Sequence, residues 1–318
     1  MKDSYLVTGA TGYIGLMILR RLLADGHCVI ALVRDQAKAL AMLPADVKML
    51  VADLEDEVVL KAMDVSCDYL IHCAAVTASS EMRTHPVEVT RSIVNATQNV
   101  LELSRRARVR SMVYVSSMEV YGNLDCSDDH RAAEVEAGRG EVDLLAARSC
   151  YPLGKRMAEN LCAAYAVEYQ VPVKIARLAQ TFGKGVLPSD KRVFAQFARA
   201  AVNGKDIVLH TEGRSMGNYC AIEDAIAGLM AILERGKNGE AYNVANEENT
   251  MSIREMAELA ADVLSGGKSR VVVDIPPDNR YGYAADTGLR LSSEKLMALG
   301  WRPTKNLRQM FLDMVETM

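Results

Sequence analysis

The stretch 8–15 places three glycines between a predicted strand and a predicted helix. It reads Thr8-Gly9-Ala10-Thr11-Gly12-Tyr13-Ile14-Gly15 and follows the short apolar segment 4–7. Apolar residues at helical spacing follow, namely Ile14, Ile18, Leu19, Leu22 and Leu23. A strand, a glycine turn and a helix form the first half of a dinucleotide-binding unit, in which the N–H groups of the first helical turn face the pyrophosphate. An ordinary glycine turn is the other interpretation, because a glycine triplet alone is weak evidence.

The three glycines have different predicted roles in such a unit. Gly9 allows a turn in which a side chain would clash, and Gly12 allows the backbone to approach a pyrophosphate. Gly15 allows the helix to pack close to the strand. Cofactor contacts are therefore predicted along the whole turn, at Gly9, Thr11, Gly12, Tyr13, Ile14 and Gly15.

Predicted strands alternate with predicted helices through the first half of the chain. Strands are indicated over 4–7, 29–33, 47–51, 69–73, 111–115 and 173–177, and long helices over 86–106 and 152–169. This alternation predicts an α/β fold with a doubly wound parallel sheet, the Rossmann fold.

The pattern changes after residue 178 and predicts a smaller, mixed C-terminal substrate lobe. Its expected elements are helices 190–203 and 222–235, strands 206–210 and 271–274, and mostly helix from Asn249 onward. We expect a dinucleotide-binding domain over 1–178, rejoined by about 217–246, and a substrate-binding lobe formed by 179–216 and 247–318. Residues 123–149 are polar, acidic and irregular, and they read as a surface excursion over the site.

Composition narrows the classes of partner. The chain has 318 residues, is half hydrophobic and carries a net charge of −4 without a basic block, which argues against nucleic-acid binding. No run of about 18 apolar residues is present, so no membrane span is predicted. The first strand begins too early to leave room for a signal peptide. Seven scattered cysteines and five isolated histidines predict free thiols in a reducing cytoplasm and no metal site.

The ends of the second and third strands bear on the choice of cofactor. An acidic side chain after the second strand usually accepts the ribose hydroxyls of NAD, but here Arg34 comes first and Asp35 one place later. Arg34 could hold the extra phosphate of NADP, which favours NADP over NAD slightly, although Asp35 could still reach a ribose. Asp53 could accept a hydrogen bond from the adenine amino group or act as a helix N-cap.

Tyr151 and Lys155 are the candidate catalytic pair. Residues four apart lie on one helical face, so the phenol and the ammonium can point to the same place. A phenol titrates near pH 10, and a neighbouring cation stabilises its phenolate. Such a phenolate can remove a hydroxyl proton while hydride leaves the same carbon for nicotinamide. Ser117, at the end of the fifth strand, could hydrogen-bond the reacting oxygen, or it could cap a turn.

Several motifs together resemble the extended short-chain dehydrogenases/reductases, in the branch of NAD-dependent sugar-nucleotide epimerases, dehydratases and decarboxylases. They are the stretches 8–15, 73–75, 116–122, 151–155, 242–244 and 299–303, together with Asp53. The resemblance implies a two-lobed α/β fold, a catalytic triad of Ser117, Tyr151 and Lys155, and cofactor contacts at Leu54, Ala74, Ala75, Tyr151 and Lys155. It also implies a homodimer that pairs the helices at about 86–106 and 152–169.

The residues after Ser117 bear on the type of reaction. The resemblance implies an Asp-Glu pair there in 4,6-dehydratases and Ser-Glu in UDP-glucuronate decarboxylases, whereas this chain has Met118-Glu119. Met118 cannot transfer a proton, which fits epimerases best, while Glu119 could act as acid, base or orienting group, or form a salt bridge. The segment from Arg148 to Arg156 looks like the decarboxylase sequence around its tyrosine.

Substrate contacts are carried over from the resemblance. Gln180 takes the place of an asparagine near the substrate phosphates, and Arg192-Val193 resembles a segment along the nucleotide. Gly217 replaces an arginine that many members place on the pyrophosphate, so Arg214 and Arg280 are the other candidate cations.

Three hypotheses follow from these residues. The leading one is an epimerase-like enzyme that transiently oxidises carbon 4 of a sugar nucleotide, with a UDP-glucuronate decarboxylase-like enzyme as an alternative. The second is an NADP(H)-dependent reductase or dehydrogenase of a sugar nucleotide or another small carbonyl compound. The third, a non-catalytic dinucleotide-sensing protein, is disfavoured by the presence of Ser117, Tyr151 and Lys155 together.

Overall fold

A seven-stranded parallel sheet forms the centre of the computed structural model, which describes residues 2–124, 126, 130–277 and 286–317. Its strand order is β10-β6-β5-β4-β1-β2-β3. The strands are β1 (Ser4–Thr8), β2 (Cys28–Val33), β3 (Lys48–Val51), β4 (Tyr69–His72), β5 (Ser111–Ser117), β6 (Val173–Leu178) and β10 (Ala241–Val244). The order reverses between β1 and β4, and such a switch point opens a crevice at the carboxyl ends of the strands. The predicted doubly wound parallel sheet is confirmed.

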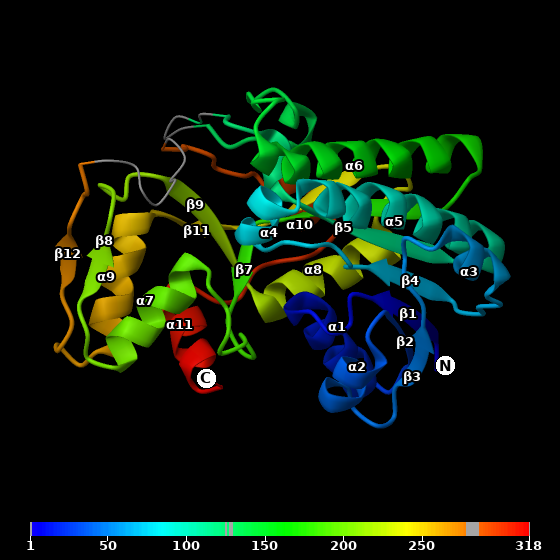
Figure 1. Cartoon of the computed structure of the whole chain (residues 1–318), viewed down its shortest axis with the longest axis horizontal. Helices are drawn as coiled ribbons and strands as arrows, with labels where there is room; N and C mark the ends of the chain where they lie inside the picture. The colour runs from blue at the N-terminus through cyan, green and yellow to red at the C-terminus, as the bar shows by residue number, and fades with distance from the viewer. Residues whose placement is uncertain (1, 125, 127–129, 278–285, 318) are drawn as a thin grey trace.

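Helices cover both faces of this sheet (Figure 1), because successive strand residues point to opposite sides. Tyr5 and Val7 of β1 belong to the core under α1 (Tyr13–Ala24), α2 (Gln36–Met42) and α8 (Ile222–Arg235). Leu6, between them, belongs to the core under α3 (Glu57–Ala62), α5 (Pro86–Ala107) and α6 (Cys150–Glu168). No helix in the described ranges is long and apolar enough to cross a membrane.

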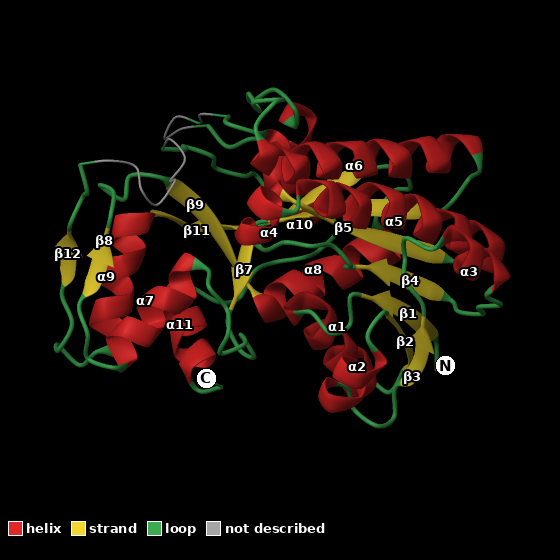
Figure 2. Cartoon of the chain, in the orientation of Figure 1, coloured by secondary structure: helices red, strands yellow, loops and turns green. Residues whose placement is uncertain are grey.

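A second, C-terminal lobe packs around its own apolar core, on the left of Figure 2. Phe182 stacks on Phe194 with ring centroids 4.3 Å apart, and the Phe311 ring centroid lies 5.2 Å from that of Phe182. The sheets of this lobe join β7 (Gln180–Phe182), β9 (Met216–Ala221) and β11 (Asn246–Ser252), and β8 (Ile207–Leu209) with β12 (Val271–Val273). Its helices are α7 (Val193–Val202), α9 (Ile253–Leu264) and α11 (Leu307–Val315).

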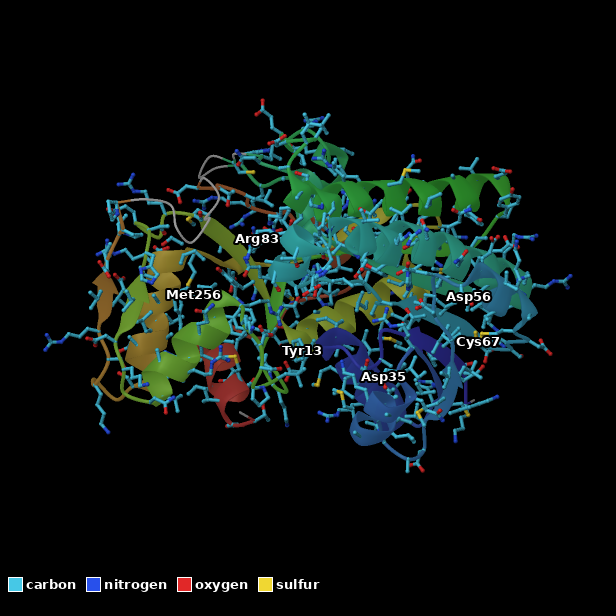
Figure 3. All side chains as sticks on the ribbon, in the orientation of Figure 1. Tyr13, Asp35, Asp56, Cys67, Arg83 and Met256 are labelled. Atoms are coloured by element: carbon cyan, nitrogen blue, oxygen red, sulfur yellow. The ribbon has the colours of Figure 1, made fainter. Side chains whose placement is uncertain are left out.

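Tyr13 lies where the two lobes meet (Figure 3). It is the first residue of α1 and packs against the cores of both lobes. Its hydroxyl donates to the Lys184 carbonyl at 3.1 Å, and the Arg192 guanidinium lies 5.8 Å from the centroid of its ring. The start of α1 is therefore in direct contact with the C-terminal lobe.

Residues 301–305 attach the end of the chain to α8. The Trp301 indole N–H donates to the Asp224 carbonyl at 2.9 Å. The Asp224 carboxylate accepts the Thr304 hydroxyl and the backbone N–H groups of Thr304 and Lys305 at 2.7–3.0 Å. These contacts follow α10 (Glu294–Met297), which packs against α8 and β10.

The structure corrects one sequence prediction outside the main sheet. The segment from Asn249 is predicted as mostly helical, but β11 extends to Ser252 because it pairs antiparallel with β9, a distant partner that local periodicity cannot show. The predicted excursion 123–149 is attached at Ala132, which is buried and bridges Leu291. Leu144 and Leu145 are exposed, and residues 125 and 127–129 lie outside the described residues.

Lys174, at the start of β6, carries a buried ammonium group whose effect on stability can be measured. It is 5 % exposed, and its Nζ donates to Ser111 Oγ at 2.7 Å and to the Pro172 carbonyl at 3.2 Å. Burial lowers its pKa to about 8. Because the charged form is disfavoured in the folded protein, we expect Lys174→Met to raise the free energy of unfolding at pH 7 by about 1 kcal/mol, a value discounted for solvent screening.

The pH dependence of stability provides the measurement. The unfolded lysine titrates near 10.5 and the folded one at about 8, so the unfolded state binds more protons between these values. The stability of the parent therefore receives a contribution from Lys174 that increases with pH in this window. Urea denaturation at about pH 7 and pH 9 should show a smaller rise for Lys174→Met than for the parent or for Lys237→Met, whose side chain is 81 % exposed. Equal rises would contradict the assignment.

Candidate active site

The glycine turn brings three backbone segments into close contact. Gly9 has φ +69°, and a Cβ on it would lie 2.7 Å from the backbone nitrogen of Ala74, after β4. A Cβ on Gly15 would overlap the Gly9 carbonyl, so α1 begins directly against the turn. A Cβ on Gly12 would meet only the Gly9 oxygen, at 3.2 Å, among the described residues. The outer side of Gly12 is thus a cradle that an added Cβ would fill, as the predicted pyrophosphate site requires.

The start of α1 has the electrostatics of an anion site. Gly12 is its N-cap and has no side chain with which to cap the helix, and the first turn contains no acidic residue. The N–H groups and the positive end of the helix dipole are therefore not neutralised by the helix itself. Together with the open side of Gly12, this favours a phosphate at that position.

The carboxylates at the ends of β2 and β3 are occupied by local contacts. Asp35 caps α2 by accepting from the Lys38 N–H at 2.9 Å, and Asp53 accepts from the Glu55 N–H at 2.9 Å. The N-cap of α3 is Asp56 and not Asp53, which corrects one of the two predicted roles of Asp53 (Figure 3). The Arg34 side chain is 73 % exposed, with its guanidinium 3.9 Å from Asp53.

A neutral histidine lies beneath the crevice. His72, the last residue of β4, is fully buried between the hydroxyls of Thr8, at 2.7 Å from Nδ1, and Thr97, at 3.2 Å from Nε2. Burial and the nearby Lys155 ammonium lower the pKa of His72 to about 3. Thr8 also accepts from the Ala74 N–H at 3.3 Å. This network holds the predicted cofactor residues after β4, Ala74 and Ala75, against the end of β1.

The structure brings Ser117, Tyr151 and Lys155 together. The Lys155 Nζ donates to the Val115 carbonyl at 2.8 Å and lies 5.9 Å from the ring centroid of Tyr151. It also lies 4.7 Å from the ring centroid of Tyr114. Ser117, at the end of β5, is close enough to the Tyr151 phenol to lower its pKa, and its hydroxyl accepts from the Glu119 N–H at 3.2 Å. The three side chains predicted to be catalytic therefore share one end of the sheet, and their roles stay predictions.

Burial is the largest cause of the pKa shifts of Lys155 and Tyr151. It lowers the pKa of Lys155 to about 8, although the neighbouring Cys73 and Glu159 favour the charged form. It raises the pKa of the Tyr151 phenol above its ordinary value, and the Glu119 carboxylate raises it further. The Ser117 side chain opposes this rise, as do the positive charges of Arg148 and Arg192.

Glu119 is engaged in an ion pair at the mouth of the site. Its two carboxylate oxygens accept from the two terminal nitrogens of Arg148 at 2.8 and 2.9 Å. Both side chains keep about a third or more of their surface exposed. Glu119 belongs to the short helix η1 (Met118–Tyr121) and Arg148 to η3 (Ala147–Ser149), so the pair connects the turn after Ser117 to the turn before Tyr151. The salt-bridge interpretation of Glu119 therefore describes this structure.

Of the residues predicted to contact the substrate, Arg192 lies near Tyr151. Arg192, the N-cap of α7 before Val193, pairs with Asp190 through both oxygens and is close enough to Tyr151 to lower its pKa. Gln180 is a half-buried residue at the start of β7, and Arg214 is exposed in the loop before β9. Arg280 lies outside the described residues.

Three residues at the site, Glu159, Thr8 and His72, are not given a role by the sequence pattern. Glu159, one helical turn after Lys155, accepts from Ser116 and from Arg177 of β6. Its position could have been predicted from the sequence, because residues four apart on a helix, such as Lys155 and Glu159, share one face. Thr8 and His72 could not be found, because their contact joins residues 64 positions apart.

Comparisons with known proteins agree with this architecture. Residues 5–245 match the family described as NAD dependent epimerase/dehydratase. UDP-glucuronic acid decarboxylase 6 of Arabidopsis thaliana is 26% identical over 96% of this chain and 85% of its own length.

Two solved structures show the same fold. UDP-glucose 4-epimerase of Thermotoga maritima, solved with UDP-glucose, has a TM-score of 0.86 at 20% identity, over 99% of this chain and 98% of that one. A dTDP-glucose 4,6-dehydratase of Streptomyces venezuelae, solved with NAD, has a TM-score of 0.79 at 23% identity, over 97% and 96% of the two chains.

Gly12 offers a test of the cofactor cradle. We expect Gly12→Ala to fold like the parent, because the new methyl group meets one carbonyl oxygen at 3.2 Å, and to bind dinucleotide at least about tenfold more weakly. Titration with NADH, followed by fluorescence, measures the affinity, and thermal unfolding of the cofactor-free protein measures stability. Gly154→Ala is the control, since its methyl group would contact only Ile93, at 3.4 Å or more. Unchanged affinity in Gly12→Ala would place the pyrophosphate elsewhere.

Proposed function

The chain belongs to the NAD-dependent epimerase/dehydratase family, and on this premise we propose that it is an epimerase-like enzyme acting on a sugar nucleotide by transient oxidation at carbon 4. The observation that carries the proposal is the assembly of Ser117, Tyr151 and Lys155 at the carboxyl edge of the sheet. The glycine turn lies at the same edge, so cofactor and substrate would meet there. When bound, the dinucleotide supplies the two-electron acceptor that this chemistry needs.

Each of the three side chains has a distinct part in the proposal. Tyr151, as phenolate, removes the proton from the sugar hydroxyl. Lys155 provides the positive charge that stabilises the phenolate, and its ammonium also holds the nicotinamide ribose. Ser117 donates a hydrogen bond to the reacting oxygen. Burial excludes water from Tyr151 and Lys155, which strengthens the attraction between phenolate and ammonium.

A decarboxylase is the second candidate, favoured by Glu119. Its carboxylate lies two residues beyond Ser117 and affects the titration of Tyr151, so it is placed to act on the substrate if Arg148 releases it. The similarity to UDP-glucuronic acid decarboxylases supports this candidate. Met118 favours the epimerase, because it cannot transfer a proton.

The cofactor of the proposal is NAD or NADP, and Arg34 supports NADP. The Arg34 side chain is 73 % exposed and its guanidinium lies 3.9 Å from Asp53, so it could exchange that contact for a ribose phosphate. If NADP is consumed with each turnover, the enzyme is the NADP(H)-dependent reductase or dehydrogenase. For the substrate, Arg192 supports a phosphate site near Tyr151, with Val193 and Gln180 beside the nucleotide and Arg214 as a further cation.

Product analysis tests the reaction and Tyr151→Phe tests the mechanism. The parent is incubated with UDP-glucose, UDP-glucuronate or dTDP-glucose, and products are separated by chromatography. An epimerase yields the carbon-4 epimer with no net change in the nicotinamide, whereas a decarboxylase yields CO2 and a pentose nucleotide. We expect Tyr151→Phe to lower kcat at least about 100-fold while dinucleotide affinity stays within about twofold. A Tyr151→Phe variant at the parent rate would refute the mechanism, and stoichiometric cofactor consumption would favour the reductase.

We also propose that the enzyme is a homodimer that pairs α5 and α6 with the same helices of a second copy. The two helices pack side by side on one face of the sheet (Figure 1). Large apolar side chains on them, Val87, Met157 and Val167, are exposed in the single chain. Burial of such side chains against a second copy is the expected driving force.

Val167→Glu tests the dimer. A carboxylate at this position would have to be buried against the partner, so we expect the variant to elute as a monomer. Size-exclusion chromatography with light scattering measures the mass. Val202→Glu, on α7 of the C-terminal lobe, exposes a similar side chain away from both helices and should keep the parent mass. A dimeric Val167→Glu would argue against this interface.

A further inference from the structure

A buried polar network continues from the end of β5 into the sheet behind the candidate catalytic residues. It joins side chains of β5, α6, η1, β6 and β10, and all of its members are 9 % exposed or less. Its members are Ser116, Tyr121, Glu159, Arg177 and Asn243. None of them contacts the glycine turn or belongs to the proposed catalytic triad.

Glu159 is the centre of this network. Its Oε1 accepts from the Ser116 hydroxyl at 2.6 Å. Both of its oxygens accept from Arg177, at 2.7 Å from Nη2 and at 3.0 and 3.1 Å from Nε. The carboxylate is therefore held in one orientation by an ion pair with several hydrogen bonds, the geometry that makes a buried charge tolerable. Ser116, which it holds, directly precedes Ser117.

Arg177 is in turn held by two residues that follow Ser117 in the chain, Tyr121 and Glu134. Its Nη1 donates to the Glu134 carbonyl at 2.8 Å and to the Tyr121 hydroxyl at 3.3 Å. The Tyr121 hydroxyl donates to the Asn243 side chain of β10 at 2.8 Å. The guanidinium also lies 5.4 Å from the centroid of the Tyr121 ring. Tyr121 ends the short helix that follows Ser117, so the network holds the backbone on both sides of that serine.

Glu159 also bears on Lys155 through its charge. The two residues are four apart on α6 and therefore on one helical face. The titratable groups that interact with Lys155 come from three elements, namely His72 and Cys73 at the end of β4, Tyr114 of β5, and Tyr151, Glu159 and Cys162 of α6. Among these groups only Glu159 is a carboxylate, and its ion pair with Arg177 of β6 holds it on the helix face of the buried ammonium.

We propose that Glu159 is a positioning residue of this active site: it fixes Ser117 through Ser116 and keeps the proton on Lys155 through its charge. The proposal rests on the proposed function, because it concerns how that triad is held. It assigns two separable effects to one carboxylate. The hydrogen bond sets the distance from Ser117 to Tyr151, and the negative charge sets the protonation of the lysine that supports the phenolate.

Ser116→Ala tests the first effect with a matched control on the same strand. We expect kcat to fall about 10- to 100-fold, with KM and dinucleotide affinity within about twofold of the parent. Ser111→Ala is the control, because Ser111 is equally buried at 4 % exposure and donates an equally short hydrogen bond of 2.6 Å to the Leu233 carbonyl at the far end of β5. Both variants lose one buried hydroxyl, so a purely structural role predicts similar losses of stability and equal kcat. Equal kcat in the two variants would overturn the first effect.

Glu159→Gln tests the second effect without substrate or cofactor. The protein is labelled with ¹³C at the lysine side chains, and the Lys155 signal is identified by its loss in Lys155→Arg. We expect the titration midpoint of Lys155 to move to lower pH in Glu159→Gln and to stay unchanged in Ser116→Ala, which keeps the charge. An unchanged midpoint in Glu159→Gln would overturn the second effect. Should the unpaired Arg177 prevent folding, Glu159→Gln combined with Arg177→Met removes both charges, and a smaller shift in the same direction is expected, because the loss of the arginine charge opposes the loss of the carboxylate charge.

The two measurements separate this proposal from the proposed function. If no nucleotide sugar is turned over but Lys155 shifts, the reaction is wrong and the electrostatic role of Glu159 stands. If turnover occurs but neither kcat in Ser116→Ala nor the Lys155 midpoint changes, the reaction stands and Glu159 is only a structural residue.

Discussion

The burial of the Lys155 ammonium is the constraint on which the site depends. A cation with 2 % exposure has lost most of its hydration, which is why its pKa falls to about 8. Part of the lost hydration energy is replaced by a hydrogen bond to the Val115 carbonyl, by the ring faces of Tyr114 and Tyr151, and by the charge of Glu159. The backbone and side-chain partners come from β5 and α6, so the charge is accommodated where that strand and that helix share an apolar core.

Other polar groups near this edge of the main sheet are either uncharged or held in an ion pair. Burial and the nearby Lys155 ammonium lower the pKa of His72 to about 3, so it stays neutral, and two threonine hydroxyls contact its nitrogens. Glu159 is held in an ion pair with Arg177. In the described part of the chain, the ammonium of Lys155 thus lies near the neutral His72 at the end of β4 and near the ion pair of Glu159 on α6. A second uncompensated cation there would oppose the charge that Tyr151 needs beside it.

The sequence predicted what depends on local patterns and missed what depends on distant partners. Alternating strands and helices were enough to predict the parallel sheet, whereas the roles of the glycine turn, Tyr151 and Lys155 stay predictions. Strands β9 and β11 could not be seen, because their pairing joins Tyr219 to Asn246 across a helix and a further strand. Asp53 was a plausible cap by position, but the turn it forms moves the cap to Asp56. Glu159 was accessible from its spacing, whereas the Arg148 partner of Glu119 lies 29 residues away.

The C-terminal lobe has a glycine where the resemblance implies an arginine. At Gly217, the place of the expected pyrophosphate arginine, an added Cβ would lie 2.6 Å from the hydroxyl of Tyr219. That hydroxyl is buried, and the Tyr219 ring packs against Phe182 in the lobe's core. A longer side chain at 217 would displace the ring and disturb the core, so the missing charge cannot be restored by that one substitution. Arg192 is differently placed, because it lies on the lobe boundary, contacts the Tyr13 ring and acts electrostatically on Tyr151. Arg192 therefore places a cation at the boundary between the lobes, near the start of α1, which favours phosphate.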